Sequence, residues 1–204
     1  MSPPGVLEEL YKLAEGIHST LERHQVLYFL EGGSAIGALR HEGIIPWDDD
    51  LDIIIRAEDE ALFLGKVREE LLEKRNIKIV KNTSEGPWDY KLFIVSKEAK
   101  TNAFCDVVVI ELDKSRNSYM FKNPTARKVL RYEFKESVVR PVLTKFGSFQ
   151  MRILPSFFND INFKHFHGKH WKTVAKTPIE DHYSHQWLIP MSFQIPESNI
   201  TGNF

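Results

Sequence analysis

The segment from residue 28 to residue 55, YFLEGGSAIGALRHEGIIPWDDDLDIII, constrains the fold more than any other part of the chain. It joins a glycine-rich turn to an acidic run, and the acidic run leads directly into a strand rich in β-branched residues. Successive side chains of a strand point to opposite faces, so Asp50 and Asp52 share one face while Leu51 and Ile53 share the other. The chain must therefore bury one face of this strand and keep carboxylates on its second face.

Paired carboxylates on a rigid strand repel each other unless a cation lies between them. Mg²⁺ and Mn²⁺ take oxygen ligands of this kind and complete their shells with water and substrate phosphates. Acidic runs are usually solvated turns, but here Asp52 lies within a strand that buries its neighbour Ile53. This context favours a metal-dependent site for phosphoryl or nucleotidyl transfer.

The glycine turn fits the same interpretation. Gly32 and Gly33 allow the backbone to approach a phosphate closely. Ser34 is predicted to cap a short helix over residues 35–40, whose first amides and dipole would point at that phosphate. On its own, Gly-Gly-Ser is more often an ordinary turn, and its distance from the acidic strand is what makes it informative.

A third carboxylate is expected from a neighbouring strand. Asp106 is preferred, because an unpaired charge inside the apolar run at 104–110 would be costly. Asp113 is the alternative, but it begins a polar loop. Asp106 also has a structural interpretation, in which it pairs with Arg40 or caps a loop.

Residues 32–52, GGSAIGALRHEGIIPWDDDLD, resemble the signature of the LicD family, which includes bacterial phosphocholine transferases and fukutin-related ribitol-phosphate transferases. Weaker similarity continues over residues 104–113 and points to Asp106. The resemblance implies a nucleotidyltransferase-like fold. It also implies transfer of a phospho-alcohol, such as phosphocholine or a polyol phosphate, from a CDP-linked donor to a sugar hydroxyl of a glycan or glycolipid.

The predicted site follows from the motif and the resemblance together. Asp50, Asp52 and Asp106 are the expected catalytic residues and ligands of one or two Mg²⁺ or Mn²⁺ ions, and one of them is a possible base toward the acceptor. The predicted substrate-binding residues are Gly32, Gly33, Ser34, Arg40, Trp47 and Lys91. Lys91 is equally well explained as a solvated lysine of an edge strand, and Trp47 as a packing wedge rather than a stacking platform.

Two other functions stay open at this point. A nucleotidyltransferase would attack a nucleoside triphosphate and release pyrophosphate, whereas a phospho-alcohol transferase would release CMP. A non-catalytic scaffold of the same fold is the third possibility, and the intact Gly33, Asp50 and Asp52 argue against it.

Composition describes an ordinary globular protein and excludes some partners. The chain has 204 residues, of which 42% are hydrophobic and 27% charged, which fits a single domain. Its net charge of −1 gives no field that would attract nucleic acid. No transmembrane segment and no signal peptide are recognised. The compartment stays open: the cytoplasm for the chain as written, or the secretory lumen if a leader or anchor precedes it.

Periodicity predicts a mixed α/β sheet flanked by helices, with a core over about residues 6–113. Beyond it, residues 119–158 show no clean periodicity, and the part from 114 to 204 is poorly assigned. A histidine-rich stretch at 165–185 favours a zinc site only weakly, since no cysteine accompanies it. The expected helices cover residues 6–24, 35–40 and 57–75, and the expected strands cover 26–30, 50–55, 77–80, 90–96 and 104–110.

Overall fold

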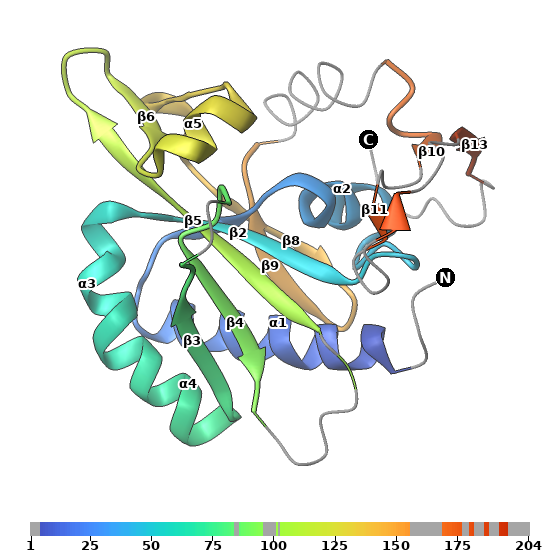
Figure 1. The fold of residues 1–204 in the computed structure, drawn as a ribbon, viewed down its shortest axis with the longest axis horizontal. Coiled ribbons are helices and arrows are strands. Elements are labelled where there is room, and N and C mark those ends of the chain that lie inside the picture. Colours follow the sequence, from blue (N-terminus) through green and yellow to red (C-terminus); the bar gives the residue numbers. More distant parts are fainter. Residues whose placement is uncertain are drawn as a thin grey trace.

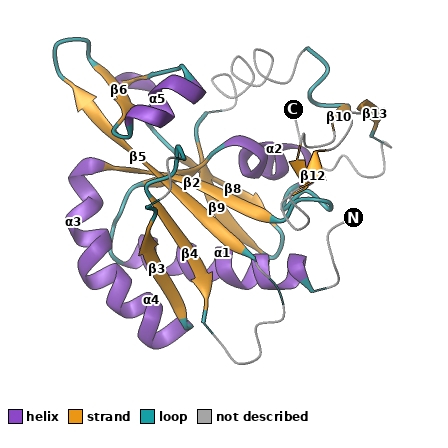
Figure 2. Cartoon of the chain, in the orientation of Figure 1, coloured by secondary structure: helices purple, strands orange, loops and turns teal. Residues whose placement is uncertain are grey.

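The computed structural model describes residues 5–83, 86–95, 101, 103–155, 169–176, 180–181, 186–187 and 192–195. Its elements follow the order expected from the sequence as far as residue 113 (Figures 1 and 2). The helices are α1 (Val6–Arg23), α2 (Gly32–His41), α3 (Glu60–Leu62), α4 (Arg68–Arg75) and α5 (Pro124–Leu130), with α3 and α4 joined by a π-helical turn at Phe63–Val67. The strands are β1 (Tyr28–Leu30), β2 (Asp50–Arg56), β3 (Ile77–Lys81), β4 (Tyr90–Ile94), β5 (Phe104–Asp113), β6 (Ser118–Phe121), β7 (Phe134–Lys135), β8 (Val142–Phe146), β9 (Phe149–Ile153), β10 (Val174–Lys176), β11 (Glu180–Asp181), β12 (Gln186–Trp187) and β13 (Ser192–Gln194).

The main sheet has the strand order β1-β2-β5-β4-β3, and β6 and β7 extend it from the far end of β5. The central strands β2 and β5 run parallel, whereas every other pair in this sheet is antiparallel. The mixed sheet with flanking helices confirms the predicted fold class. Because β5 inserts between β2 and β4, residues far apart in the sequence become neighbours at the centre of the sheet.

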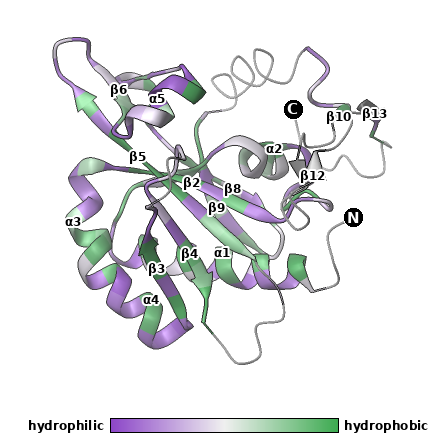
Figure 3. Ribbon diagram, viewed as in Figure 1, coloured by the Kyte–Doolittle hydropathy of each residue, from purple (hydrophilic) through white to green (hydrophobic). Residues whose placement is uncertain are grey.

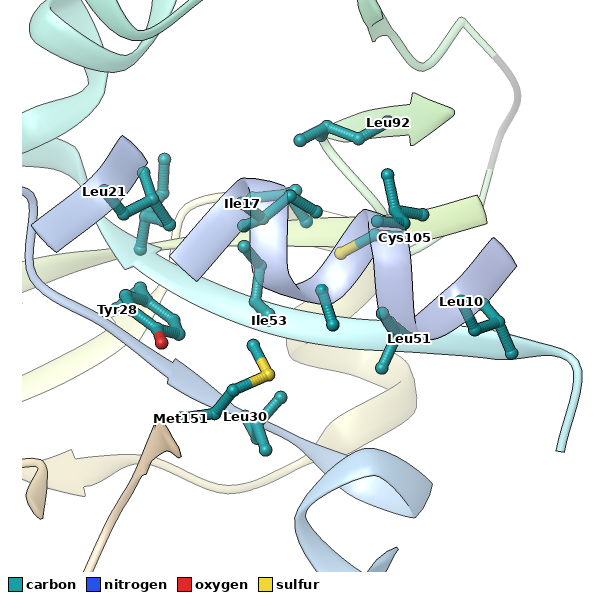
Figure 4. Packing of buried hydrophobic residues seen from close by; sticks show 14 of the residues in the cluster. Leu10, Ile17, Leu21, Tyr28, Leu30, Leu51, Ile53, Leu92, Cys105 and Met151 are labelled. Carbon is teal, nitrogen blue, oxygen red and sulfur yellow. The ribbon is translucent and has the colours of Figure 1, made fainter. Parts of the chain in front are cut away.

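One face of the sheet is covered by α1 and by the helices from α3 to α4. Leu10 and Ile17 of α1 pack on Leu51 and Ile53 of β2 and on Cys105 of β5, and all five side chains are buried (Figure 4). Cys105 is a buried free cysteine of this core. Along α3 and α4, hydrophobic and hydrophilic colours alternate, as expected for helices with one face on a core (Figure 3).

The opposite face is apolar over only part of its area. There Phe29, Ile54 and Val108 form a second buried cluster with Phe121 of β6 and Phe134 of β7. Two of these side chains come from residues beyond 113, so the segment without clean periodicity contributes part of the core. The rest of this face, toward the start of β2 and β5, carries the charged residues described below.

The hairpin of β8 and β9 forms a separate small sheet beside β1. Met151 of β9 reaches the main core close to Leu30 (Figure 4). Within the described ranges, none of the helices is both long enough and apolar enough to cross a lipid bilayer.

Candidate functional site

Four charged side chains form one transverse row across the sheet. Asp52 of β2 is the register partner of Asp106 on β5, and Asp106 is the register partner of Lys91 on β4. At the other end of the row, the amide of Glu31 donates to the carbonyl of Asp52 at 3.0 Å. Register partners project from the same face of a sheet, so Asp52, Asp106 and Lys91 share one face. Glu31 adjoins Asp52 at the end of the row opposite the cationic Lys91.

The three predicted acidic residues lie together. One carboxylate oxygen each of Asp50, Asp52 and Asp106 lies within 4.8 Å of the others, and Asp106 is only 3% exposed. Asp48 and Asp49 form a second acidic group with Asp50. By contrast, Asp113 lies seven residues further along β5, about 23 Å away at 3.3 Å per residue, so it cannot belong to the same group.

The cluster carries an electrostatic cost that a cation would relieve. Burial raises the pKa of Asp52 well above its ordinary value, and the neighbouring carboxylates of Asp50 and Asp106 raise it further. The Oδ1 atom of Asp52 is buried and accepts no hydrogen bond from the described residues. A buried carboxylate oxygen of this kind, with two further carboxylates beside it, matches the all-oxygen donor set that Mg²⁺ or Mn²⁺ takes.

Lys91 lies at the cationic end of the row and not on an edge strand, since β3 separates β4 from the edge of the sheet. Its Nζ is 3.6 Å from Oδ1 of Asp106 and 3.5 Å from the centroid of the Phe104 ring. More than a third of the side chain is exposed, so the ammonium group faces both the acidic cluster and solvent.

The glycine turn lies against the carboxylates, but Ser34 does not cap the helix as predicted. Helix α2 begins at Gly32, and Ser34 lies inside its first turn, where its buried Oγ accepts a hydrogen bond from the amide of Asp52 at 2.9 Å. Gly32 itself adopts a φ of +52°, in the left-handed region that glycine tolerates. A Cβ on Gly32 would lie 3.5 Å from Oδ2 of Asp52, so the turn and the acidic strand are in close contact.

Arg40 on α2 and Trp47 in the loop before β2 complete the predicted substrate-binding set. Arg40 is 4% exposed, and its Nη1 donates to the carbonyl of Trp171 at 2.9 Å. Burial lowers the pKa of Arg40 to about 10, while the nearby Asp48 opposes the shift. Trp47 packs partly against the main core, and its ring meets that of His41 edge-on at 5.8 Å. Arg40 therefore ties α2 to the segment around Trp171, and a substrate contact for Arg40 or Trp47 stays a prediction.

Sequence reasoning missed Glu31 and its partner. Glu31 immediately precedes α2, and the hydroxyl of Tyr132 donates to its Oε1. Burial raises the pKa of Glu31 to about 7. The position of Glu31 could have been predicted from the sequence. The alternation of side chains along β1, continued to residue 31, places Glu31 on the same face of the sheet as Phe29. No local pattern signals Tyr132, which lies 101 residues further along the chain.

Most of the histidine-rich stretch lies outside the residues that the structure describes. His165, His167, His182 and His185 lie outside the described residues. His170 is described, in a turn that precedes β10.

More than half of the chain matches the model of one protein family. Residues 25–155 match the family model described as LicD/FKTN/FKRP, nucleotidyltransferase domain. The match spans the glycine turn, the acidic row, strands β3 to β9 and Tyr132 in the loop between α5 and β7.

Three relatives are similar to short parts of this chain. Lipopolysaccharide cholinephosphotransferase LicD of Haemophilus influenzae is 40% identical over 60 residues, which is 29% of this chain and 23% of that protein. Ribitol 5-phosphate transferase FKRP of Homo sapiens is 48% identical over 58 residues, or 28% of this chain and 12% of that protein. An uncharacterised protein of Rickettsia typhi is 50% identical over 54 residues, which is 26% of this chain and 18% of that protein. Each alignment thus covers less than a quarter of the relative's length.

Two solved structures give a distant comparison. ANT(2″)-Ia in complex with adenylyl-2″-tobramycin has a TM-score of 0.46 and 11% identity, covering 81% of this chain and 87% of that chain. The lincosamide antibiotic adenylyltransferase LnuA has a TM-score of 0.45 and 18% identity, covering 81% of this chain and 95% of that chain.

Proposed function

Because this chain belongs to the LicD/FKTN/FKRP family of nucleotidyltransferase domains, we propose that it is a phospho-alcohol transferase. The donor would be a CDP-linked alcohol, the transferred group phosphocholine or a polyol phosphate, and the acceptor a sugar hydroxyl of a glycan or glycolipid. Two relatives carry names of this kind, a cholinephosphotransferase and a ribitol 5-phosphate transferase. The observation that carries the proposal is the convergence of Asp50, Asp52 and Asp106 beside a glycine turn and a lysine.

In the proposed reaction, the acceptor oxygen attacks the phosphorus that bears the alcohol. A bond forms between that oxygen and phosphorus, the bond from phosphorus to the CMP oxygen breaks, and CMP leaves. The proton of the acceptor hydroxyl passes to one of the three aspartates, which acts as the base. Asp50, Asp52 and Asp106 would hold Mg²⁺ or Mn²⁺, which when bound neutralises negative charge on the donor phosphates. Phosphoryl transfer depends mainly on positioning and charge stabilisation, so this small set of residues is sufficient.

The residues of the chain have separate tasks in this proposal. Lys91 contacts a donor phosphate from the cationic end of the row, where its ammonium group is open to solvent. Gly33 and Ser34 present the first-turn amides of α2, which have no partners within the helix, toward the donor. The Oγ of Ser34 holds the backbone of Asp52 and so fixes α2 against the acidic strand.

The test is CMP release from CDP-choline, CDP-ribitol, CDP-glycerol and CDP-ethanolamine with Mg²⁺ or Mn²⁺. Wild type is measured beside Asp50→Ala/Asp52→Ala, and Asp113→Asn is the matched control, because Asp113 lies on the same strand as Asp106 but outside the cluster. Metal-dependent release that is lost in the double variant and kept in the control would support the proposal.

Two outcomes would overturn it. Release of pyrophosphate from a nucleoside triphosphate, with no CMP from any CDP-alcohol, would indicate a nucleotidyltransferase. Absence of both activities, together with absence of Mn²⁺ binding by calorimetry, would indicate a non-catalytic scaffold.

A further inference from the structure

We propose that Glu31 is the group that binds the acceptor hydroxyl, and that Tyr132 positions it. This inference rests on the proposed transfer reaction and adds a direction to it: the donor lies toward Lys91 and the acceptor arrives at the opposite end of the row. Neither residue belongs to the acidic motif or to the predicted substrate-binding set.

Glu31 belongs to the row but lies outside the groups that can hold a metal. Its amide is bonded to the carbonyl of Asp52, so its position is fixed relative to β2. Among the described residues, the two carboxylate groups compatible with a metal ion are Asp48–Asp49–Asp50 and Asp50–Asp52–Asp106, and Glu31 is in neither. Glu31 therefore adjoins the acidic cluster without being one of its three members.

The charge of the two substrates determines which of them Glu31 can bind, the anionic donor or the neutral acceptor. The diphosphate of a CDP-alcohol is anionic, so a carboxylate repels it and an ammonium group attracts it. Lys91 therefore marks the donor end, while Glu31 suits a neutral hydroxyl that can donate a hydrogen bond. Three strand spacings separate the two residues, about 14 Å at 4.8 Å each, which leaves room for a diphosphate and an incoming hydroxyl.

The in-line geometry of phosphoryl transfer agrees with this polarity. The attacking and leaving oxygens lie on opposite sides of the transferred phosphorus. With the phosphates held at the centre of the row and toward Lys91, the attacking oxygen has to come from the side of Glu31.

Tyr132 holds the Glu31 carboxylate in place from another part of the fold. Its hydroxyl donates to Oε1 of Glu31, and its ring packs edge-on against Phe121 and Phe134 at 5.1 and 5.3 Å. Burial and the nearby carboxylate of Glu31 raise the pKa of Tyr132 well above its ordinary value, so its hydroxyl stays a donor at neutral pH. The Glu31 carboxylate also accepts from the amide of Gly32, and its remaining lone pairs can accept an acceptor hydroxyl.

The experiment separates acceptor binding from donor binding. Initial rates of transfer are measured with varied donor and with varied acceptor, using methyl glycosides of galactose, glucose and N-acetylglucosamine and free ribitol as acceptor probes. The variants are Glu31→Gln and Tyr132→Phe. Tyr119→Phe is the matched control, since Tyr119 belongs to the same aromatic cluster but donates its hydroxyl to Glu58 at 3.2 Å.

We expect Glu31→Gln to raise the acceptor KM and thereby to lower kcat/KM for the acceptor about 10- to 100-fold, the range for loss of a strong hydrogen bond. Tyr132→Phe should lower it about tenfold with a raised acceptor KM. The donor KM and the Mn²⁺ affinity should stay within about twofold of wild type in both variants, and Tyr119→Phe should change none of these values.

An unchanged acceptor KM in both variants, or an equal loss for donor and acceptor, would overturn the inference while leaving the transferase in place. Weaker Mn²⁺ binding in Glu31→Gln would reassign Glu31 as a metal ligand. If Glu31→Gln does not fold, Tyr132→Phe decides alone, because it removes one oxygen and keeps the packed ring. Should wild type transfer from neither a CDP-alcohol nor a nucleoside triphosphate, the proposed function fails and this inference fails with it.

Discussion

The two faces of β2 and β5 have the same backbone but opposite chemistry. On the face under α1, Leu51 and Ile53 are each 1% exposed and lie in a continuous apolar core. On the other face, the same strands present Asp50, Asp52 and Asp106, and the apolar cluster begins only one row further along. The fully covered face supplies the stability that holds mutually repelling carboxylates in place on the other face.

The largest effect should come from moving a charge to the covered face. Ile53→Asp would bury a carboxylate beneath α1 without a partner, so we expect a loss of at least about 4 kcal/mol in the free energy of unfolding. Urea denaturation measures this loss. The matched exchange on the other face, Asp52→Ile, should leave a folded protein without transferase activity. An equal loss of unfolding free energy in Ile53→Asp and Asp52→Ile would show that the two faces contribute equally to stability.

A smaller loss of stability is expected from a substitution at Gly37, where α2 packs closely on the loop that leads to the acidic strand. A Cβ at Gly37 would lie 2.5 Å from the carbonyl oxygen of Gly43 and 3.2 Å from the amide nitrogen of Ile45, both backbone atoms of the loop that leads to the acids. Gly37→Ala should therefore cost about 1–3 kcal/mol of unfolding free energy, as overpacking usually does. Thermal unfolding together with Mn²⁺ binding tests this, and an unchanged Tm with unchanged metal affinity would contradict it.

The smallest expected effect is a dependence of stability on pH in metal-free protein. The pKa of Glu31 is raised from 4.5 to about 7 and that of Asp52 is raised as well, so the folded state binds more protons than the unfolded state between these values. Stability is then greatest below about pH 4.5 for these groups and is lost as pH rises through about 7. We expect the Tm to fall by a few degrees from pH 5 to pH 8.

Two controls sharpen this pH dependence. Glu31→Gln and Asp52→Asn should each flatten the slope, because the titrating group is removed. Added Mn²⁺ should raise the Tm at pH 8, since it binds the ionised carboxylates of the folded state. A Tm that rises with pH in metal-free wild type would show that other groups dominate.

Much of the first half of the fold was predictable because its signals are local. Alternation around Asp50 and Asp52 gave the strand and its two faces, and the apolar run at 104–110 gave the partner strand and Asp106. Element boundaries differ from those expected by at most three residues through β4 and β5. Ser34 was misassigned because α2 begins two residues before it, at Gly32, and no side-chain hydrogen bond caps this end of the helix.

The second half was not predictable because its strands are short and half-exposed. In β8, Val142 and Leu143 are 49% and 44% exposed, so apolar residues there do not mark a buried face. Tertiary contacts determine the pairing of β6 with the far end of β5, and the periodicity of the sequence does not reveal this pairing. The hydrogen bond from Tyr132 to Glu31 depends on the same pairing. The position of Tyr132 beside the acidic row was therefore known only from the structure.

The insertion of β5 between β2 and β4 has a consequence for the nascent chain. During synthesis β2 emerges 48 residues before β5 begins, so its apolar edge stays unpaired on that side until the later strand arrives. Open apolar edges invite association between chains, and flanking like charges oppose it. The run Asp48–Asp49–Asp50 lies directly at the start of this edge. We therefore expect the acidic run to keep unfinished chains apart before β5 docks, so that its replacement by neutral residues lowers the yield of soluble refolded protein.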